Sequence, residues 1–134
     1  MTSQKVTTAY IQTDAEDTSP LFSLQFLGYF CPIATGMYKF QTTSDDGSWL
    51  WIGIPAISPT QQDANVNNGG THGSTQVIGK AVKLTAGIYY PIRVHMWDSG
   101  GNWTLGTQWS SDNGMTFSSD FETRIFYNSA TNGF

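Results

Sequence analysis

The chain has 134 residues, of which 14% are aromatic and 12% charged, and its formal net charge is -4. Phosphate backbones are bound mainly through Lys and Arg, so this acidic chain is a poor candidate for a nucleic-acid partner. No stretch approaches the roughly 20 apolar residues that a membrane-spanning helix needs, and we therefore expect no membrane insertion.

The length fits one folded unit, and we expect residues 1–134 to form a single domain with one hydrophobic core. The single cysteine, Cys31, excludes an internal disulfide, so stability must come from the core or from a bound ion. Residues 1–12 lack the basic and then apolar pattern of a secretory signal. Either a signal has been removed, or the protein reaches the outside by another route such as virion assembly.

Short runs that alternate between apolar and polar residues predict strands along most of the chain. In chain order these runs are 21–29, 37–43, 88–96, 104–109 and 121–127. The run 49–52 is apolar on both faces, which is typical of a strand covered on both sides. No window of ten or more residues combines a helical apolar period with caps. We therefore predict an all-β fold, an antiparallel, jelly-roll-like β-sandwich with very little helix.

Two loops between these runs hold polar residues of chemical interest. The first is the tight turn 44–48, Ser-Asp-Asp-Gly-Ser, and the second is 97–103, Trp-Asp-Ser-Gly-Gly-Asn-Trp. Asp-Asp-Gly is also a common β-turn sequence, so the residues alone leave a turn-only role open for the first loop. The second loop could likewise be a solvated hairpin connection.

A third irregular region, the polar stretch 58–79, is too long for a passive connection, and we expect it to fold over a face or edge of the sandwich. It contains His72, for which we expect a surface or hydrogen-bonding role. The same stretch, with Asp63 and Asn65, is a candidate to line a binding site.

Several segments stand in an order and spacing that match a known family. They are 28–30 (Gly-Tyr-Phe) with Pro32, 35–40 (Thr-Gly-Met-Tyr-Lys-Phe), 44–47 (Ser-Asp-Asp-Gly), 50–53 (Leu-Trp-Ile-Gly) and 84–94 (Leu-Thr-Ala-Gly-Ile-Tyr-Tyr-Pro-Ile-Arg-Val). Together they resemble the GLEYA adhesin and protective-antigen-type family of carbohydrate-binding β-sandwich domains. The resemblance spans about Phe22 to Trp109.

The resemblance implies a calcium ion held by the loops at one end of the sandwich, with hydroxyls of a bound sugar completing its coordination. It implies that Asp45 and Asp46 supply carboxylates, often across a cis peptide bond. The second loop would supply a side-chain oxygen, which aligns with Asp98, and main-chain carbonyls near Gly100 and Asn102. Calcium takes about 6–8 oxygen ligands, and carboxylates and carbonyls are its usual suppliers. The side chain of Asn102 competes with Asp98 for the side-chain position.

Sugar contacts are expected from the residues around the second loop. Trp103 and Trp97 flank the loop and could stack on a sugar ring, while Ser99 and Gly101 lie between them in the sequence. Indoles more often pack in a core, and this alternative stays open for both tryptophans.

The leading interpretation is a calcium-dependent, lectin-like module that attaches to cell-surface glycans through a hexose with vicinal hydroxyls, outside the cell or at its surface. The alternative is a structural or host-recognition component of a virus particle that contacts other proteins of the assembly. A third possibility is a protein-docking domain whose loops calcium only stabilises. An enzyme is disfavoured, because the sequence lacks a nucleophile elbow, a phosphate loop and a zinc-type cluster.

Overall fold

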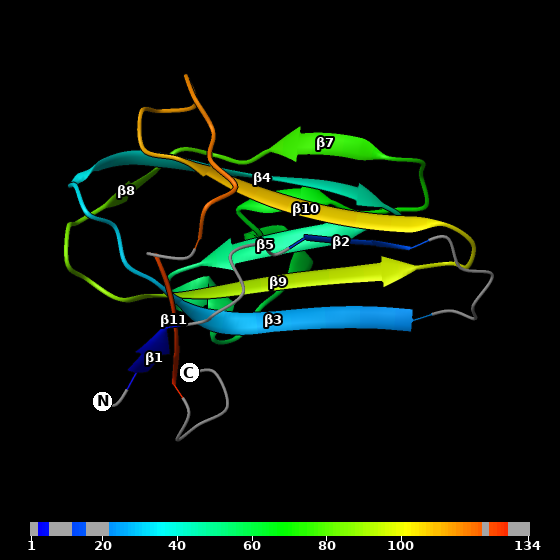
Figure 1. Cartoon of the computed structure of the whole chain (residues 1–134), viewed down its shortest axis with the longest axis horizontal. Coiled ribbons are helices and arrows are strands. Elements are labelled where there is room, and N and C mark those ends of the chain that lie inside the picture. Colours follow the sequence, from blue (N-terminus) through cyan, green and yellow to red (C-terminus); the bar gives the residue numbers. More distant parts are fainter. Residues whose placement is uncertain (1–2, 6–11, 16–21, 122–123, 129–134) are drawn as a thin grey trace.

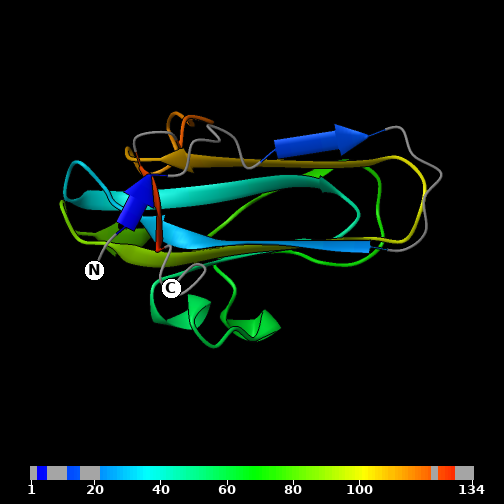
Figure 2. The same ribbon diagram turned by 60° about the horizontal axis from the view of Figure 1, so that its bottom comes forward.

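Two antiparallel sheets stack face to face in the computed structural model, which describes residues 3–5, 12–15, 22–121 and 124–128 (Figures 1 and 2). The six-stranded sheet has the order β1 (Ser3–Lys5), β11 (Ile125–Asn128), β3 (Phe22–Phe30), β9 (Tyr90–Asp98), β5 (Ser48–Ile52) and β6 (Val66–Asn68). The five-stranded sheet has the order β2 (Gln12–Ala15), β10 (Trp103–Ser110), β4 (Gly36–Asp45) and β7 (Thr75–Ile78), with β8 (Val82–Leu84) also paired to β4. The predicted antiparallel β-sandwich is therefore confirmed.

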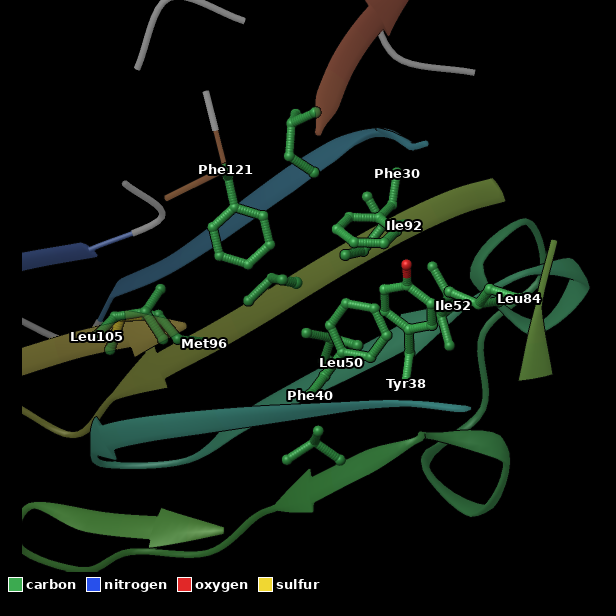
Figure 3. Close-up of a cluster of buried hydrophobic side chains, with 13 residues drawn as sticks. Phe30, Tyr38, Phe40, Leu50, Ile52, Leu84, Ile92, Met96, Leu105 and Phe121 are labelled. Carbon is green, nitrogen blue, oxygen red and sulfur yellow. The ribbon is translucent and has the colours of Figure 1, made fainter. Parts of the chain in front are cut away.

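The core lies between the sheets and consists of the side chains for which the sequence alternates. On β4, Tyr38 and Phe40 point inward and are 2% and 0% exposed, and Leu105 on β10 is fully buried. Phe30 belongs to the cluster drawn in Figure 3, and its ring centroid lies 5.2 Å from that of Phe40 and 6.3 Å from that of Phe121. Edge-to-face contacts of this kind add to the free energy gained by burying the rings.

The outer face of the six-stranded sheet carries a second, smaller cluster. Trp49 and Trp51 alternate with core residues along β5 and are 7% and 4% exposed, because Ala56 and Ala64 cover them together with Trp97. The short 3-10 helices η1 (Ile54–Ala56) and η2 (Gln61–Asp63) lie beneath this sheet in Figure 2. Every residue of β5 is buried, which confirms the prediction of a strand covered on both sides.

Some predicted boundaries differ from those observed. The run 88–96 begins as strand only at Tyr90, and Ile88 is 49% exposed in the preceding turn. In the run 121–127, the strand starts at Ile125 although Phe121 is already fully buried, and residues 122 and 123 lie outside the described residues. The polar region 58–79 is more regular than expected, since it contributes β6 to one sheet edge and β7 to an edge of the other. No helix in the described part of the chain is long and apolar enough to cross a membrane.

The loop that follows β10 is organised around one carboxylate. Asp112 accepts hydrogen bonds from Ser110 Oγ (2.6 Å), Thr116 Oγ1 (2.6 Å) and the Thr116 N–H (2.9 Å). The bond from Ser110, followed by those from Thr116, lowers the pKa of Asp112 from 3.8 to about 2. A carboxylate with a depressed pKa stabilises the folded state above its unfolded pKa, and this contribution disappears as the pH falls through the folded value.

We therefore expect Asp112→Asn to flatten the acid limb of the stability curve. Between the ordinary value of 3.8 and about 2, the wild type should lose more stability than the variant, because only the wild type has this carboxylate to protonate. Melting temperatures measured from pH 5 to pH 2 test this difference. Parallel curves for the two proteins would contradict it.

Candidate metal and ligand site

The two loops singled out in the sequence meet at one end of the sandwich, at the right of Figure 1, where β4 and β9 end and β10 begins. Asp45 is paired with Thr104 at the start of β10, and Ser48 with Met96 near the end of β9. In addition, the Trp97 N–H donates to the carbonyl oxygen of Gly47 over 2.9 Å. Strand pairing therefore holds the acidic turn against both ends of the second loop.

Three carboxylates converge at this tip. Asp45, Asp46 and Asp98 each offer an oxygen, and these oxygens lie within 4.8 Å of one another. Asp46 and Asp98 are 4% and 1% exposed, and Asp45 is half-buried. The peptide bond between Asp45 and Asp46 is cis, as the family resemblance implied.

Asp46 is held in place from two sides. Its Oδ1 accepts a hydrogen bond from the His72 N–H (2.9 Å), and its Oδ2 accepts from the Ser99 N–H (2.8 Å) and Ser99 Oγ (2.6 Å). Ser99, predicted as a ligand contact, thus orients an acidic side chain here. Each carboxylate oxygen has two lone pairs, so Oδ1 of Asp46, which accepts a single bond, keeps one lone pair for a cation.

Asp98 has one oxygen paired and one unpaired. Its Oδ2 accepts from the Gly100 N–H at 2.9 Å, whereas its buried Oδ1 has no hydrogen-bond partner among the described residues. Gly100 and Gly101 adopt φ values of 109° and 97°, which residues with a Cβ rarely reach. A buried, unpaired carboxylate oxygen is costly unless a cation or water binds it, which makes Oδ1 of Asp98 a candidate metal ligand.

The negative charges of the three carboxylates repel one another. Burial and the charges of Asp46 and Asp98 raise the pKa of Asp45 above its usual range, while His72 acts in the opposite direction. Burial would also raise the pKa of Asp46, but its hydrogen bonds from Ser99 and His72 outweigh this effect and lower the pKa. Asp46 therefore stays ionised at neutral pH beside carboxylates that repel it, an arrangement that a bound cation would relieve.

The spacing fits a hard cation with oxygen ligands. Two oxygens bound to one calcium ion at about 2.3–2.6 Å can lie at most about 5 Å apart. The three carboxylate oxygens, all within 4.8 Å of one another, satisfy this limit. The donor set is made of oxygen atoms alone, which favours calcium or a similar ion over zinc or copper.

A buried hydroxyl network supports the acidic turn from below. Ser44 Oγ donates to the Asp46 carbonyl oxygen (2.7 Å) and lies 2.7 Å from Ser48 Oγ, which donates to Thr42 Oγ1 (2.9 Å). The amide of Asn68 on β6 donates to Ser44 Oγ (3.2 Å). Alternation along β4 predicts that Thr42 and Ser44 face inward, but the residue types alone do not indicate that these hydroxyls support the acidic turn.

Only part of the polar stretch 58–79 contacts the site. Besides its bond to Asp46, His72 directs its ring nitrogens at the carbonyl oxygens of Gly73 (2.9 Å) and Asn68 (3.1 Å). Burial lowers the pKa of His72, but these carbonyls and the nearby carboxylates raise it by more. Asp63 instead accepts a bond from Thr60 Oγ1, and Asn65 donates to the Lys80 carbonyl, so neither is bonded to the acidic cluster.

The two tryptophans beside the second loop differ in their surroundings. Trp97 packs with the outer-face cluster, and its indole leaves no space for a Cβ on Gly47. This packing favours the core alternative for Trp97. Trp103 is half-buried against the main core and keeps part of its surface exposed near the tip. Gly101 and Asn102 are exposed, and their role as ligands stays a prediction.

A family model supports the interpretation of this region. The model of the GLEYA domain matches residues 22–111. The chain belongs to the GLEYA domain family. The matched range includes both loops of the acidic tip and confirms the resemblance found in the sequence. No curated protein matches this GLEYA domain.

Solved structures share its fold. The PA14 domain of the MpAFP antifreeze protein has a TM-score of 0.66 at 20% identity, over 80% of this chain and 52% of that one. The epithelial adhesin 6 A domain of Candida glabrata, in complex with Galβ1-3GlcNAc, has a TM-score of 0.65 at 19% identity, over 88% of this chain and 64% of that one. The PA14 sugar-binding domain of an RTX adhesin has a TM-score of 0.65 at 18% identity, over 82% of this chain and 56% of that one. The GLEYA domain thus spans between half and two thirds of these chains.

Proposed function

We propose that this GLEYA domain binds carbohydrate at the acidic tip through a calcium ion and serves attachment to glycans at a cell surface. The observation that carries the proposal is the unpaired Oδ1 of Asp98, 1% exposed within reach of two further carboxylates. Three buried or half-buried negative groups in this geometry need a cation, and a tip that opens to solvent at Ser99 and Gly100 leaves room for a ligand.

Each residue of the tip has a distinct role in this proposal. Asp45, Asp46 and Asp98 hold the ion, and the main-chain carbonyls of Gly100 and Asn102 complete the protein's share of the ligands. A bound calcium ion keeps open coordination positions that two adjacent sugar hydroxyls can fill. Ser99 holds Oδ2 of Asp46, so that Oδ1 of the same carboxylate faces the ion before a ligand arrives.

The structural neighbours favour sugar over the other ligand classes. One neighbour is an adhesin domain solved with a galactose-terminated disaccharide, and another is a PA14 sugar-binding domain. By analogy we place this domain outside the cell or at its surface, as a binding module without catalytic activity and with residues 1–134 as one unit. The alternative of a virus-particle component gains no support from these neighbours.

Removal of calcium is expected to abolish glycan binding. On an array of galactose-terminated glycans, the wild type should bind in calcium and lose its signal in EGTA, because the carboxylates alone repel one another and offer no positive centre to hydroxyls. Asp46→Asn should not bind in either buffer. Asp63→Asn, an equivalent change on an exposed 3-10 helix, serves as the control and should bind like the wild type.

Two outcomes would contradict the proposal in different ways. Glycan binding that persists in EGTA would remove the metal from the mechanism. A calcium-dependent rise in melting temperature without binding to any glycan would instead indicate that the ion only stabilises the loops.

A further inference from the structure

The outer face of the five-stranded sheet has a polar hollow beside the acidic tip. A cavity of about 300 Å³ opens there, at the lower end of the usual range for ligand pockets. Its lining includes Gln41 and Thr43 of β4, Thr104 and Gln108 of β10, Gln76 of β7, and Ser119. None of the described residues that line it is charged or aromatic.

Strand register explains how the hollow forms. On β4, Tyr38, Phe40, Thr42 and Ser44 are buried between the sheets, so the odd-numbered residues face outward. Across the strands, Gly106 pairs with Thr43 and Thr43 with Gln76, and Gln108 pairs with Gln41. Gly106 thus stands in the middle row, where its missing side chain leaves the depression.

The hollow lies next to the candidate metal site. Thr104 lines the cavity and pairs directly with Asp45, one of the three converging carboxylates. Asp45 and Gln41 are four residues apart on one strand, which is about 13 Å at about 3.3 Å per residue. A chain-like ligand whose end is held at the tip could therefore extend along β4 and β10 over this distance.

The chemistry of the lining selects a neutral ligand rich in hydroxyls. The side chains of Thr43, Thr104 and Gln76 have no hydrogen-bond partner among the described residues, and each can both donate and accept. Gln41, Gln108 and Ser119 are joined in a hydrogen-bonded row, Gln41 Nε2 donating to Gln108 Oε1 and Gln108 Nε2 to Ser119 Oγ (2.9 Å), which fixes their orientation. An anionic or cationic polymer would find no counter-charge here, whereas a neutral oligosaccharide would find alternating donors and acceptors.

We propose that this hollow is a second carbohydrate subsite, which binds the units that follow a terminal sugar held at the tip. The inference rests on the proposed function, since the acidic tip sets where the glycan chain begins. The subsite makes the domain a reader of neutral oligosaccharides rather than of terminal residues alone.

The test compares a short and a long probe by calorimetry in saturating calcium. The probes are methyl β-galactoside and the neutral tetrasaccharide Galβ1-3GlcNAcβ1-3Galβ1-4Glc. The wild type should bind the tetrasaccharide about tenfold more tightly, the gain from one or two net hydrogen bonds. Gly106→Val should abolish this advantage and leave the galactoside affinity unchanged, because the new side chain occupies the middle of the hollow and does not reach the tip.

Two further variants keep the test sharp. A Cβ added at Gly106 would meet only Thr43, at 4.0 Å, and a Cβ added at Gly36 would meet only the Ser111 carbonyl oxygen, also at 4.0 Å. Gly36 lies at the far end of β4 from the acidic tip. Gly36→Val is therefore the matched control and should keep the advantage of the longer probe. Gln76→Ala removes an exposed amide from the lining without adding volume and should reduce the advantage several-fold. Melting curves confirm that each variant is folded.

The outcomes separate this inference from the proposed function. If the wild type binds the galactoside in calcium but gains nothing from the longer probe, or if Gly106→Val keeps the gain, the hollow is a solvated surface and the tip alone binds sugar. If the wild type binds neither probe, the proposed function and the subsite both fail.

Discussion

Asp98→Asn is expected to abolish the calcium-dependent rise in melting temperature and to leave the calcium-free protein as stable as the wild type, or more stable. Without the ion, Asp98 brings a negative charge next to two others, and one of its oxygens is buried without a partner. Asn has nearly the same shape and can still accept the hydrogen bond from the Gly100 N–H. The substitution therefore removes repulsion and a metal ligand in a single step.

The size of the calcium response follows from mass action. At a free calcium concentration about 100 times Kd, binding to the folded state alone adds about 2.7 kcal/mol to the stability. This corresponds to roughly 10 °C in the melting temperature of a domain of this size. Thermal denaturation in calcium and in EGTA measures it for the wild type, for Asp98→Asn and for the Asp63→Asn control. A variant that melts lower than wild type in EGTA but keeps the full calcium response would show that Asp98 has only a structural role.

Phe30→Ala is expected to cost about 3–5 kcal/mol of unfolding free energy, the range observed when large buried aromatic residues are truncated. The ring of Phe30 is 0% exposed, and four aromatic rings surround it with centroids between 5.2 and 6.3 Å away. Alanine would leave a cavity that these rings, which belong to β4, β10 and the segment after β10, cannot all move to fill. A domain of this length has a total stability of only about 7–20 kcal/mol, so the loss is a large fraction of it.

Phe26→Ala provides the matched control for Phe30→Ala. Phe26 lies on the same strand but is 36% exposed, so its truncation should cost less than half as much. Urea denaturation at fixed calcium concentration measures both losses. Similar costs for the two variants would show that Phe30 is not the centre of the core.

Strand order along the chain and much of the core could be predicted because alternation on β4, β9 and β10 is uninterrupted. Tyr38, Phe40 and Leu105 face inward because each lies in phase with its apolar neighbours. The boundary near Ile88 could not be predicted, since an apolar residue in a turn follows the same pattern as one in a strand. The edge strands β6 and β7 could not be predicted either, because their short sequences form strands only by pairing with β5 and β4.

The candidate site was predictable to the level of its loops and its three carboxylates. The family resemblance assigned Asp45, Asp46 and Asp98 to one ion, and the structure brings their oxygens together. The residues that hold these carboxylates in place could not be derived from the sequence. His72, for example, lies 26 positions from Asp46 and donates to it through its backbone N–H and not through its ring. A backbone donor leaves no trace in the residue type.

A crystal grown in calcium, with anomalous difference density measured at a long wavelength, tests the central claim most directly. The convergence of the three carboxylates predicts one strong peak between Asp45, Asp46 and Asp98, with each of these residues placing an oxygen at about 2.3–2.6 Å from it. Oxygens of these residues that face solvent, with no peak among them at saturating calcium, would contradict the metal site and with it the proposed mode of sugar binding.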